Sequence, residues 1–257
     1  MLAKSHLLLA VSPQDSRVAL TYGLPVAHGA YRVGGGPHLF RASMPVAVRG
    51  GLMIIDDGGF DGLGDGSQFC REVIRECLAR NFDGVICHFG ARPLPILGKI
   101  VSELGELMAK RGWPLYVTEP YARFSEKSKV LISSALSGGS LRQRLGEAVN
   151  AYGPERVALS VERVAEDFFL PSPTGQGAKL SREELARRIE ELAPSIFFSS
   201  ELCAHYFTYM SPSGAHFILF DDGGSIRKKL QIARSMDISD AILPFAQVSD
   251  LLPELLR

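Results

Sequence analysis

The chain has 257 residues, of which 46% are hydrophobic and 22% are charged, and its 28 Lys and Arg residues balance 28 Asp and Glu residues. The hydrophobic content excludes a disordered chain, and the balanced charge gives no reason to expect a nucleic acid or an anionic membrane as a partner. No apolar run approaches the roughly 20 residues that a membrane-spanning helix needs, so no membrane span is expected.

The first 50 residues predict one strand and no export signal. The apolar stretch at 7–11 has the length of a strand, and no small-residue cleavage site follows it, so the layout of a signal peptide is missing. We therefore expect a cytoplasmic protein. Residues 14–50 fit no regular element, and the run at 32–37, with three consecutive glycines before a proline, predicts a loop.

From residue 51 onward, short apolar runs alternate with amphipathic stretches. The expected strands are 51–57, 82–89, 115–118, 130–133, 157–161 and 241–245, and the expected helices are 67–80, 96–111, 141–152, 225–236 and 249–256. A further helix begins after Ser181, because Ser181 and Glu184 have the spacing of a capping box. Residues 207–209 and 216–220 flank a turn and predict a hairpin, and Asp222 predicts the N-cap of the next helix.

This alternation predicts parallel βα units. About six units follow residue 51, and with one or two strands before it the count approaches the eight of a barrel. We predict an α/β fold in which a (β/α)8 barrel, irregular at its N-terminus, forms a single domain over residues 1–257. A small α+β insert is expected at about 172–222.

The cysteines give no sign of a metal or redox centre. Cys70, Cys77, Cys87 and Cys203 form no Cys-x-x-Cys pair, so we expect reduced cysteines in the core. No cofactor is predicted.

In (β/α)8 barrels, reactive groups lie at the C-terminal ends of the strands. The residues at those ends are Asp56, Asp57, His88, Glu119, Ser133, Ser134, Glu162 and those near Phe245. The carboxylates and the histidine are candidates for acid–base catalysis. Asp56, Asp57 and His88 do not have the spacing of a known metal-ligand set, so no metal site is predicted.

Motifs in the expected fourth strand and in the C-terminal third carry a family resemblance. Residues 82–90 read Phe-Asp-Gly-Val-Ile-Cys-His-Phe-Gly, residues 167–171 read Asp-Phe-Phe-Leu-Pro, and residues 207–230 contain Phe-Thr-Tyr, Gly214, His216, Phe-Asp-Asp and Ser-Ile-Arg-Lys-Lys-Leu in that order. Together they resemble glycoside hydrolase family 18, the family of chitinase-like barrels, and in particular its spore-cortex and spore-germination branch. The resemblance covers roughly residues 51 to 250.

The resemblance also implies that the family's catalytic residues are replaced. The family's fourth strand reads Phe-Asp-Gly-(Ile/Val)-Asp-x-Asp-Trp-Glu, and against it Asp83 matches the first Asp, with an expected structural role. Ile86 stands at the second Asp, His88 at the third, and Gly90 at the catalytic Glu. The family's Met-x-Tyr-Asp segment has no counterpart in 130–137, and its Trp on the last strand is replaced by Pro244 or Phe245.

The missing groups are those that the chemistry needs. In this family the Glu protonates the leaving oxygen while the substrate's own acetamide attacks the anomeric carbon, and the neighbouring Asp holds that acetamide. Gly90 has no proton to donate, and Ile86 has no charge. General acid catalysis contributes about 10²- to 10⁴-fold. No carboxylate lies between Gly84 and Ile100, so a small shift of the alignment does not restore the acid.

His88 and its carboxylate neighbours have structural interpretations beside the functional ones. Strand alternation points His88 into the barrel mouth, where it either contacts a ligand or is a polar plug bonded to a residue such as Asp56. Adjacent residues cannot both face the interior, so one of Asp56 and Asp57 is a site carboxylate and the other caps the turn.

Two glutamates and three aromatic residues complete the candidates. Glu119 and Glu162 are relocated acids, partners of nearby arginines (Arg123, Arg163), or residues that face the solvent. The predicted ligand contacts are His88, Asp57, Glu119, Tyr121, Phe245 and Tyr206. Tyr206 has the alternative of building the insert's own small core.

These observations leave three hypotheses. The first is a catalytically inactive barrel that binds a glycan containing N-acetylglucosamine, such as peptidoglycan, or a protein partner, in a sporulation-related and spore-associated setting. The second is an active glycoside hydrolase with relocated carboxylates, which needs two of them in one cleft roughly 5 to 10 Å apart. The third is a scaffold whose mouth is filled by Phe89, Tyr121 or Phe245.

Overall fold

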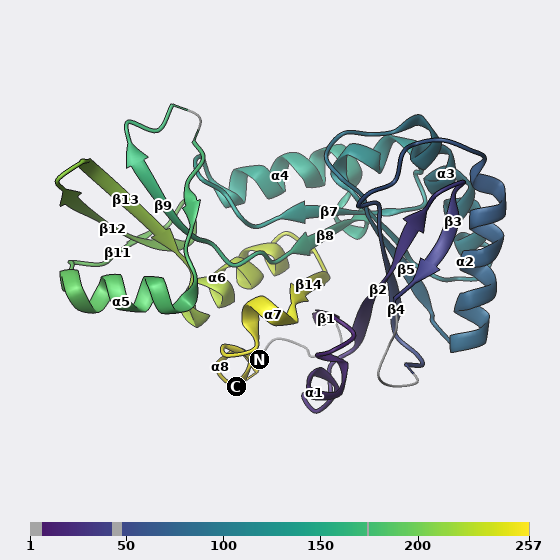
Figure 1. Cartoon of the computed structure of the whole chain (residues 1–257), viewed down its shortest axis with the longest axis horizontal. Helices are drawn as coiled ribbons and strands as arrows, with labels where there is room; N and C mark the ends of the chain where they lie inside the picture. The colour runs from purple at the N-terminus through teal and green to yellow at the C-terminus, as the bar shows by residue number, and fades with distance from the viewer. Residues whose placement is uncertain (1–6, 43–47, 174, 257) are drawn as a thin grey trace.

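The computed structural model describes residues 7–42, 48–173 and 175–256. Within these ranges eight parallel strands form a closed barrel, and they are β1 (Leu7–Val11), β2 (Val26–Gly34), β4 (Leu52–Asp56), β5 (Gly84–His88), β6 (Leu115–Thr118), β7 (Lys129–Ser133), β8 (Val157–Ser160) and β14 (Asp240–Pro244). The ring closes because β1 pairs with both β14 and β2. The predicted (β/α)8 barrel is confirmed (Figure 1).

Helices follow the barrel strands. They are α1 (Ser16–Leu20), α2 (Gly66–Arg80), α3 (Pro95–Ala109), α4 (Leu141–Tyr152), α6 (Gly223–Arg234), α7 (Phe245–Val248) and α8 (Leu252–Leu255), with short 3-10 turns η2 (Glu119–Phe124) and η3 (Pro154–Arg156). The single helix expected at 249–256 is wrong, because the chain forms the two short helices α7 and α8 instead. None of the helices in the described ranges is long and apolar enough to cross a bilayer.

The loop predicted at 32–37 is also wrong in its first half. Strand β2 continues to Gly34 and pairs with β3 (His38–Arg41) in an antiparallel hairpin. The physical reason is burial: Tyr31 and Val33 alternate with exposed residues and pack toward α2, so the strand pattern persists up to the glycines.

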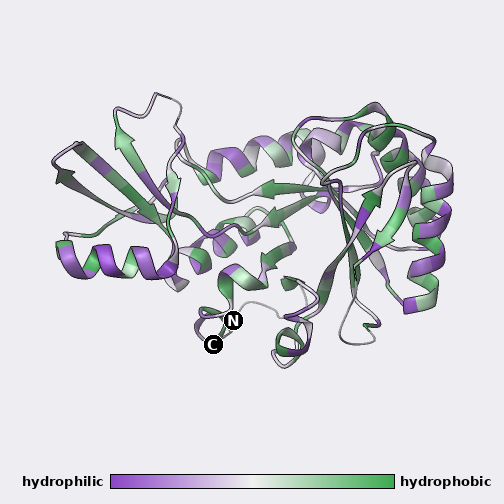
Figure 2. Ribbon diagram, viewed as in Figure 1, coloured by the Kyte–Doolittle hydropathy of each residue, from purple (hydrophilic) through white to green (hydrophobic). Residues whose placement is uncertain are grey.

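The side chains separate into an inner core and an outer layer. Small and aliphatic residues fill the barrel: Leu8, Ala27, Leu52, Ile86, Tyr116, Leu131, Ala158 and Ile242. Larger clusters lie between the strands and the helices, and they include Phe69, Phe89 and Tyr121 on one side and Leu145, Leu230 and Phe245 on the other. Figure 2 shows this arrangement as hydrophobic central strands beneath helices with hydrophilic outer faces.

An α+β insert follows β8. Its antiparallel sheet has the order β10-β9-β13-β12-β11, and α5 packs on one face of it. The elements are β9 (Ala165–Leu170), β10 (Ala178–Lys179), α5 (Arg182–Leu192), β11 (Phe197–Ser199), β12 (Ala204–Ser211) and β13 (Gly214–Phe220). The insert begins at β9, before the expected residue 172, because 165–170 pairs with β13 along its whole length. Figure 1 shows the insert to the left of the barrel.

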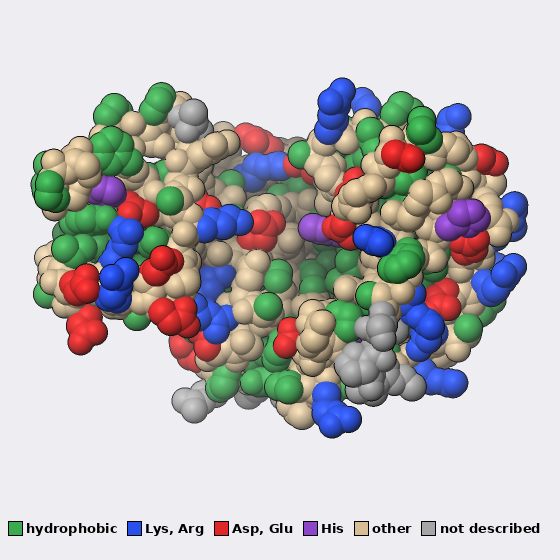
Figure 3. Space-filling model, in the orientation of Figure 1, with side chains coloured by type: hydrophobic (Ala, Val, Ile, Leu, Met, Phe, Trp, Pro, Cys, Tyr) green, Lys and Arg blue, Asp and Glu red, His purple; other side chains and the backbone are tan. Residues whose placement is uncertain are grey.

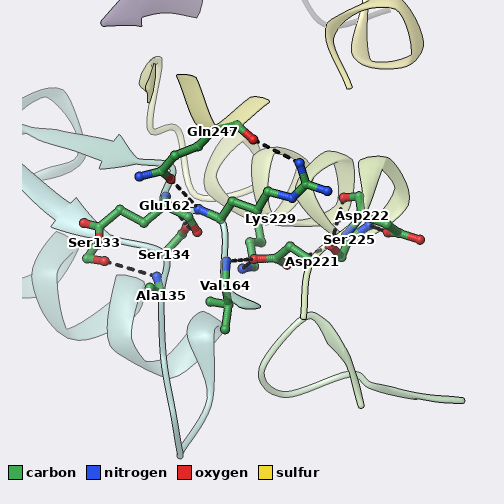
Figure 4. A network of polar contacts seen from close by, with 11 residues as sticks. Ser133, Ser134, Ala135, Glu162, Val164, Asp221, Asp222, Ser225, Lys229 and Gln247 are labelled. Atoms are coloured by element: carbon green, nitrogen blue, oxygen red, sulfur yellow. Dashed lines mark hydrogen bonds and ion pairs between the residues drawn. The ribbon is translucent and has the colours of Figure 1, made fainter. Parts of the chain in front are cut away.

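The insert is joined to α6 by a buried ion pair. Lys229 and Asp221 are both fully buried at their side chains, and Lys229 Nζ donates to Asp221 Oδ2 over 2.6 Å. Asp221 also accepts from the backbone N–H of Val164 over 2.8 Å and from the hydroxyl of Ser225 over 2.7 Å (Figure 4). The next residue, Asp222, caps α6 through a capping box with Ser225, as predicted.

We predict that Lys229→Met destabilises the protein by about 3–5 kcal/mol, because it leaves Asp221 buried without its cation. The double variant Lys229→Met/Asp221→Asn restores most of that loss, since neither charge remains. Chemical unfolding of both variants measures the difference. Equal stability of the single and double variants would contradict the role given to the ion pair.

His28 on β2 is a buried polar side chain without compensation. It is 2% exposed, it packs against Phe82, and neither of its ring nitrogens has a hydrogen-bond partner among the described residues. Burial lowers the pKa of His28, and the nearby backbone of Gly50 offsets this only in part. The folded protein therefore holds this ring neutral.

This lowered pKa makes stability depend on pH. Below the usual histidine pKa of about 6.5, His28 binds a proton in the unfolded chain but not in the folded one. The free energy of unfolding therefore decreases as the pH decreases through that value. We predict that His28→Leu reduces this loss between about pH 7 and pH 5. Thermal unfolding of both proteins across this pH range measures the loss of stability. If stability depends on pH equally in the parent and in His28→Leu, His28 does not titrate in this way.

Candidate functional site

A pocket of about 370 Å³ opens at the C-terminal ends of β5, β6, β7 and β8. Its lining comprises His88, Phe89, Ala91, Thr118, Glu119, Pro120, Leu131, Ser133, Ala135, Leu136, Arg144, Ser160 and Glu162. A second pocket of similar volume begins at Ala135 and Leu136 and reaches Glu166 and Lys179 of the insert. The two form one cleft, which Figure 3 shows as a hollow between the insert and the rest of the barrel.

Strand β5 contributes to the pocket as its alternation predicts. Val85, Cys87 and Phe89 pack outward against α2 and α3, and Ile86 lies in the barrel interior. His88, one step further along the inward row, is exposed at the mouth. The residue facing the cleft at this point is therefore an imidazole, with an apolar side chain below it.

Asp56 and His88 lie side by side on neighbouring strands. His88 Nδ1 is 3.7 Å from Asp56 Oδ2, and both side chains are more than half exposed. Asp56 Oδ1 also accepts a 2.6 Å hydrogen bond from the backbone N–H of Gly58, so Asp56 is the residue that caps the turn. On the other side of β4, Arg32 is the register partner of Asp56. This row of charged and ionisable groups forms one rim of the barrel.

Asp57 makes an unexpected contact with Gly90. The backbone N–H of Gly90 lies 3.0 Å and 3.1 Å from the two carboxylate oxygens of Asp57. A Cβ atom on Gly90 would lie 3.7 Å and 3.8 Å from those oxygens, which is ordinary contact, and the backbone of Gly90 is not left-handed. Neither backbone conformation nor steric crowding excludes a side chain at this position.

Glu119 and Glu162 line the same pocket from β6 and β8. Glu119 is paired with Arg144 of α4, which also lines the pocket. Glu162 is positioned through its backbone, whose N–H donates to the hydroxyl of Ser134 over 3.1 Å (Figure 4). The carboxylate of Glu162 has no hydrogen-bond or ionic partner in the described part of the chain, so it is free to meet a ligand.

The prediction that Arg123 and Arg163 pair with Glu119 and Glu162 is wrong. Arg163 makes a bidentate contact with Asp250 at 2.9 Å, and Arg123 lies over the ring of Phe124. The partner that Glu119 does find comes from a helix that starts more than 20 residues later.

Two of the predicted aromatic ligand contacts do not face the cleft. Tyr121 is fully buried between Phe89 and Phe124, its hydroxyl accepts from the backbone N–H of Leu94 over 3.1 Å, and burial raises its pKa. Phe245 packs edge-on against Tyr22 in the outer layer. These predictions are wrong because neither residue lies on a barrel strand: Tyr121 lies in the 3-10 turn η2, and Phe245 is the first residue of α7.

The same placement excludes the scaffold hypothesis in the form given above. Phe89, Tyr121 and Phe245 all lie between strands and helices, so none of them plugs the mouth. On β14, Ile242 lies in the interior and Leu243 and Phe245 lie outside, so Pro244 takes the inward position at the end of this strand.

Tyr206 lies in the insert, where it stacks on Phe217 at 5.4 Å between ring centroids and approaches Phe197 at 5.6 Å. It packs against the same buried cluster of the insert as Ala135, which lines both pockets, but Tyr206 itself is not among the residues that line either pocket. Of the two interpretations of Tyr206, the structure supports a place in the insert's own core.

The pocket also contains polar residues that sequence reasoning missed: Thr118, Arg144 and Ser160. Thr118 and Ser160 end β6 and β8, so the strand-end rule was sufficient to find them. Arg144 comes from α4, and no sequence signal pointed to it.

Metal and thiol chemistry have no support within the described residues. No group of three or more His, Cys, Asp or Glu side chains there is arranged to hold a metal ion. The four cysteines are buried, and burial raises the pKa of Cys70 and of Cys77 to about 12, which keeps both as thiols. The cysteines are core residues, as expected.

We predict that Gly90→Ala changes the free energy of unfolding by no more than about 0.5 kcal/mol, because the added methyl group meets only ordinary contacts. Asp57→Ala provides the comparison, since it removes the acceptor of the Gly90 N–H and costs about 1 kcal/mol. Chemical unfolding measures both, and a large loss with Gly90→Ala would show that the site requires glycine.

Solved structures similar to this one include chitinases and spore cortex-lytic enzymes. A chitinase from Chromobacterium violaceum superposes with a TM-score of 0.75 at 14% identity, over 98% of each chain. A glycoside hydrolase family 18 chitinase from Cycas revoluta, solved in complex with (GlcNAc)3, gives a TM-score of 0.69 at 14% identity, again over 98% of each chain. The spore cortex-lytic enzyme SleL of Bacillus megaterium gives 0.67 at 14% identity, over 93% of this chain and 70% of that one.

These similarities establish that the fold is that of glycoside hydrolase family 18. No protein-family model matches the sequence, and no curated protein sequence matches it either. At 14% identity the comparison identifies the fold, and the residues in the cleft must indicate the chemistry.

Proposed function

We propose that this protein binds a glycan containing N-acetylglucosamine in the cleft at the barrel mouth and does not cleave it by the mechanism of chitinases. The observation that carries the proposal is the end of β5. The inward row there reads Ile86, His88, Gly90, so the strand that supplies the acid in the resembling family supplies no carboxylate here. The fold and the open cleft support binding, and the missing proton donor argues against turnover.

The cleft has groups that suit a neutral, hydroxyl-rich ligand. Glu162 accepts hydrogen bonds without a competing partner in the described residues, and Thr118, Ser133 and Ser160 present hydroxyls from neighbouring strands. Such groups orient a sugar through its hydroxyl and amide groups, and the second pocket extends the cleft toward the insert. Two of the similar structures are spore or chitin enzymes, which favours peptidoglycan or chitin fragments as ligands in a spore-associated setting.

A second candidate function is hydrolysis with relocated carboxylates, because Glu119, Glu162 and His88 line one pocket. Two features weaken it. Arg144 forms an ion pair with Glu119, and Asp57 is engaged with the backbone of Gly90. Among the described residues that line the pocket, Glu162 is then the one carboxyl group without a partner, whereas glycoside hydrolysis ordinarily requires two carboxyl groups.

We predict that the protein binds chitin oligosaccharides or peptidoglycan fragments without releasing shorter products. Glu162→Gln weakens binding by about tenfold, which corresponds to one hydrogen bond from a ligand to a charged group. Calorimetry measures binding, and chromatography of the same mixtures measures cleavage. Glu155→Gln is the matched control. Glu155 is exposed and lies just before the start of β8, at the end of the strand away from the cleft.

Turnover that persists in Gly90→Ala and is lost in Glu162→Gln or Glu119→Gln would replace the proposal with the second candidate. Absence of both binding and cleavage for every oligosaccharide would contradict both.

A further inference from the structure

The insert contains a serine, a histidine and a carboxylate in hydrogen-bonded order, away from the barrel mouth. Ser211 ends β12, His216 lies on β13, and Asp167 lies on β9, so three adjacent strands bring them together. Ser211 Oγ is 3.2 Å from His216 Nε2, and His216 Nδ1 is 2.9 Å from Asp167 Oδ1. This is the order of contacts that activates a serine hydroxyl in unrelated hydrolases.

The surroundings fix the roles of the two ring nitrogens. Arg188 of α5 and the hydroxyl of Tyr209 both donate to Asp167 Oδ2, which leaves Oδ1 for His216. Because a carboxylate only accepts hydrogen bonds, the neutral imidazole carries its proton on Nδ1 and presents the lone pair of Nε2 to Ser211. The base is therefore oriented toward the hydroxyl.

Packing holds the ring in this position. The His216 ring stacks on Tyr209 with centroids 4.6 Å apart and planes 12° apart, and Phe169 contacts it edge-on at 5.3 Å. Asp167 is buried, and Arg188 balances its charge. A rigid histidine between a buried carboxylate and a hydroxyl needs no rearrangement before it accepts a proton.

Ser211 itself lies at the hairpin turn. Its Oγ lies 2.7 Å from Ser213 Oγ, donates to the carbonyl oxygen of Gly214 over 3.3 Å, and accepts from the backbone N–H of Ser213 over 3.2 Å. That N–H stabilises negative charge on Oγ as its proton leaves. Ser211 is partly exposed, and Pro212 and Ser213 after it are exposed, so the hydroxyl lies near the surface of the hairpin.

We propose that Ser211 is a nucleophile toward short-chain acyl esters, with His216 as its general base and Asp167 as a positioning residue. Ser211 Oγ forms a bond to the ester carbonyl carbon while its proton passes to His216 Nε2. The bond from that carbon to the alcohol oxygen then breaks, and the alcohol leaves with the proton. Water attacks the acyl-serine through the same histidine, which releases the carboxylic acid and restores the hydroxyl.

The open surface determines the class of substrate. An ester that approaches this partly exposed hydroxyl needs no channel, so the proposal is limited to a small acyl group such as acetyl. This activity is separate from glycan binding, because none of the three residues lines the cleft.

The test uses the full chain with p-nitrophenyl acetate as the probe. We expect p-nitrophenol release above the buffer rate and an acetyl group on Ser211, identified by mass spectrometry after acid quenching. Ser211→Ala and His216→Phe lower the rate by at least about tenfold, within the range of general-base catalysis. His216→Phe keeps an aromatic ring against Tyr209, and Ser195→Ala, at an exposed serine elsewhere in the insert, is the control that stays within about twofold of the parent rate.

Asp167→Asn tests the positioning role through the pH profile of acetylation. Asparagine has nearly the same shape as aspartate, so the packing around position 167 is kept. We expect a lower acetylation rate together with a shifted midpoint in its pH profile, and a purely structural role would not shift that midpoint. Thermal unfolding confirms that each variant is folded. Acetylation on other residues that persists in Ser211→Ala, or a parent rate equal to the buffer rate, would overturn the proposal.

Discussion

The pairing of β5 with β4 and β6 is the constraint on which the rest of the account depends. Parallel ladders on both sides fix the register of β5, and a strand in such a register has no freedom to exchange its inward and outward rows. Ile86, His88 and Gly90 therefore form the inward row. Val85, Cys87 and Phe89 form the outward row and pack beneath α2 and α3. The chemistry available at the mouth follows from this phase.

The neighbouring strands supply only some of the carboxylates that the inward row of β5 lacks. Glu119 and Glu162 bring carboxylates to the same pocket, but Arg144 pairs with the first and leaves the second alone. Asp57 comes close to Gly90 and is used to hold its backbone N–H. A cleft with one free carboxylate and several hydroxyls is suited to holding a sugar, whereas the cleavage of a glycosidic bond ordinarily needs a pair of carboxyl groups.

Most of the fold was predictable because its signals are local. Apolar runs and amphipathic stretches predicted the barrel strands from β4 to β14 and the main helices between them, but not β9, β10 and β11 of the insert. The caps at Ser181 and Asp222 are where the residue types placed them. The hairpin β2–β3 was missed, since glycines mask a strand whose evidence is the burial of Tyr31 and Val33 against a helix far along the chain. Long-range burial is not visible in a local pattern.

The site was predictable where it depends on strand ends and unpredictable where it depends on phase or on helices. His88, Glu119 and Glu162 were found because each directly follows or ends a strand. Tyr121 and Phe245 were placed wrongly, since the chain leaves β6 and β14 just before them, and the turn η2 and the helix α7 direct their rings into the outer layer. Arg144 reaches the pocket from α4, and only the folded arrangement shows which carboxylate it meets.

The most direct measurement of the central claim is a crystal structure of the protein with a chitin oligosaccharide, grown over days at neutral pH. The account predicts an intact oligosaccharide along the cleft, with a sugar against Glu162 and His88 and no carboxylate within hydrogen-bond reach of the linkage oxygen above Gly90. A cleaved oligosaccharide, or an intact one whose linkage oxygen meets Asp57 or Glu162, would contradict it.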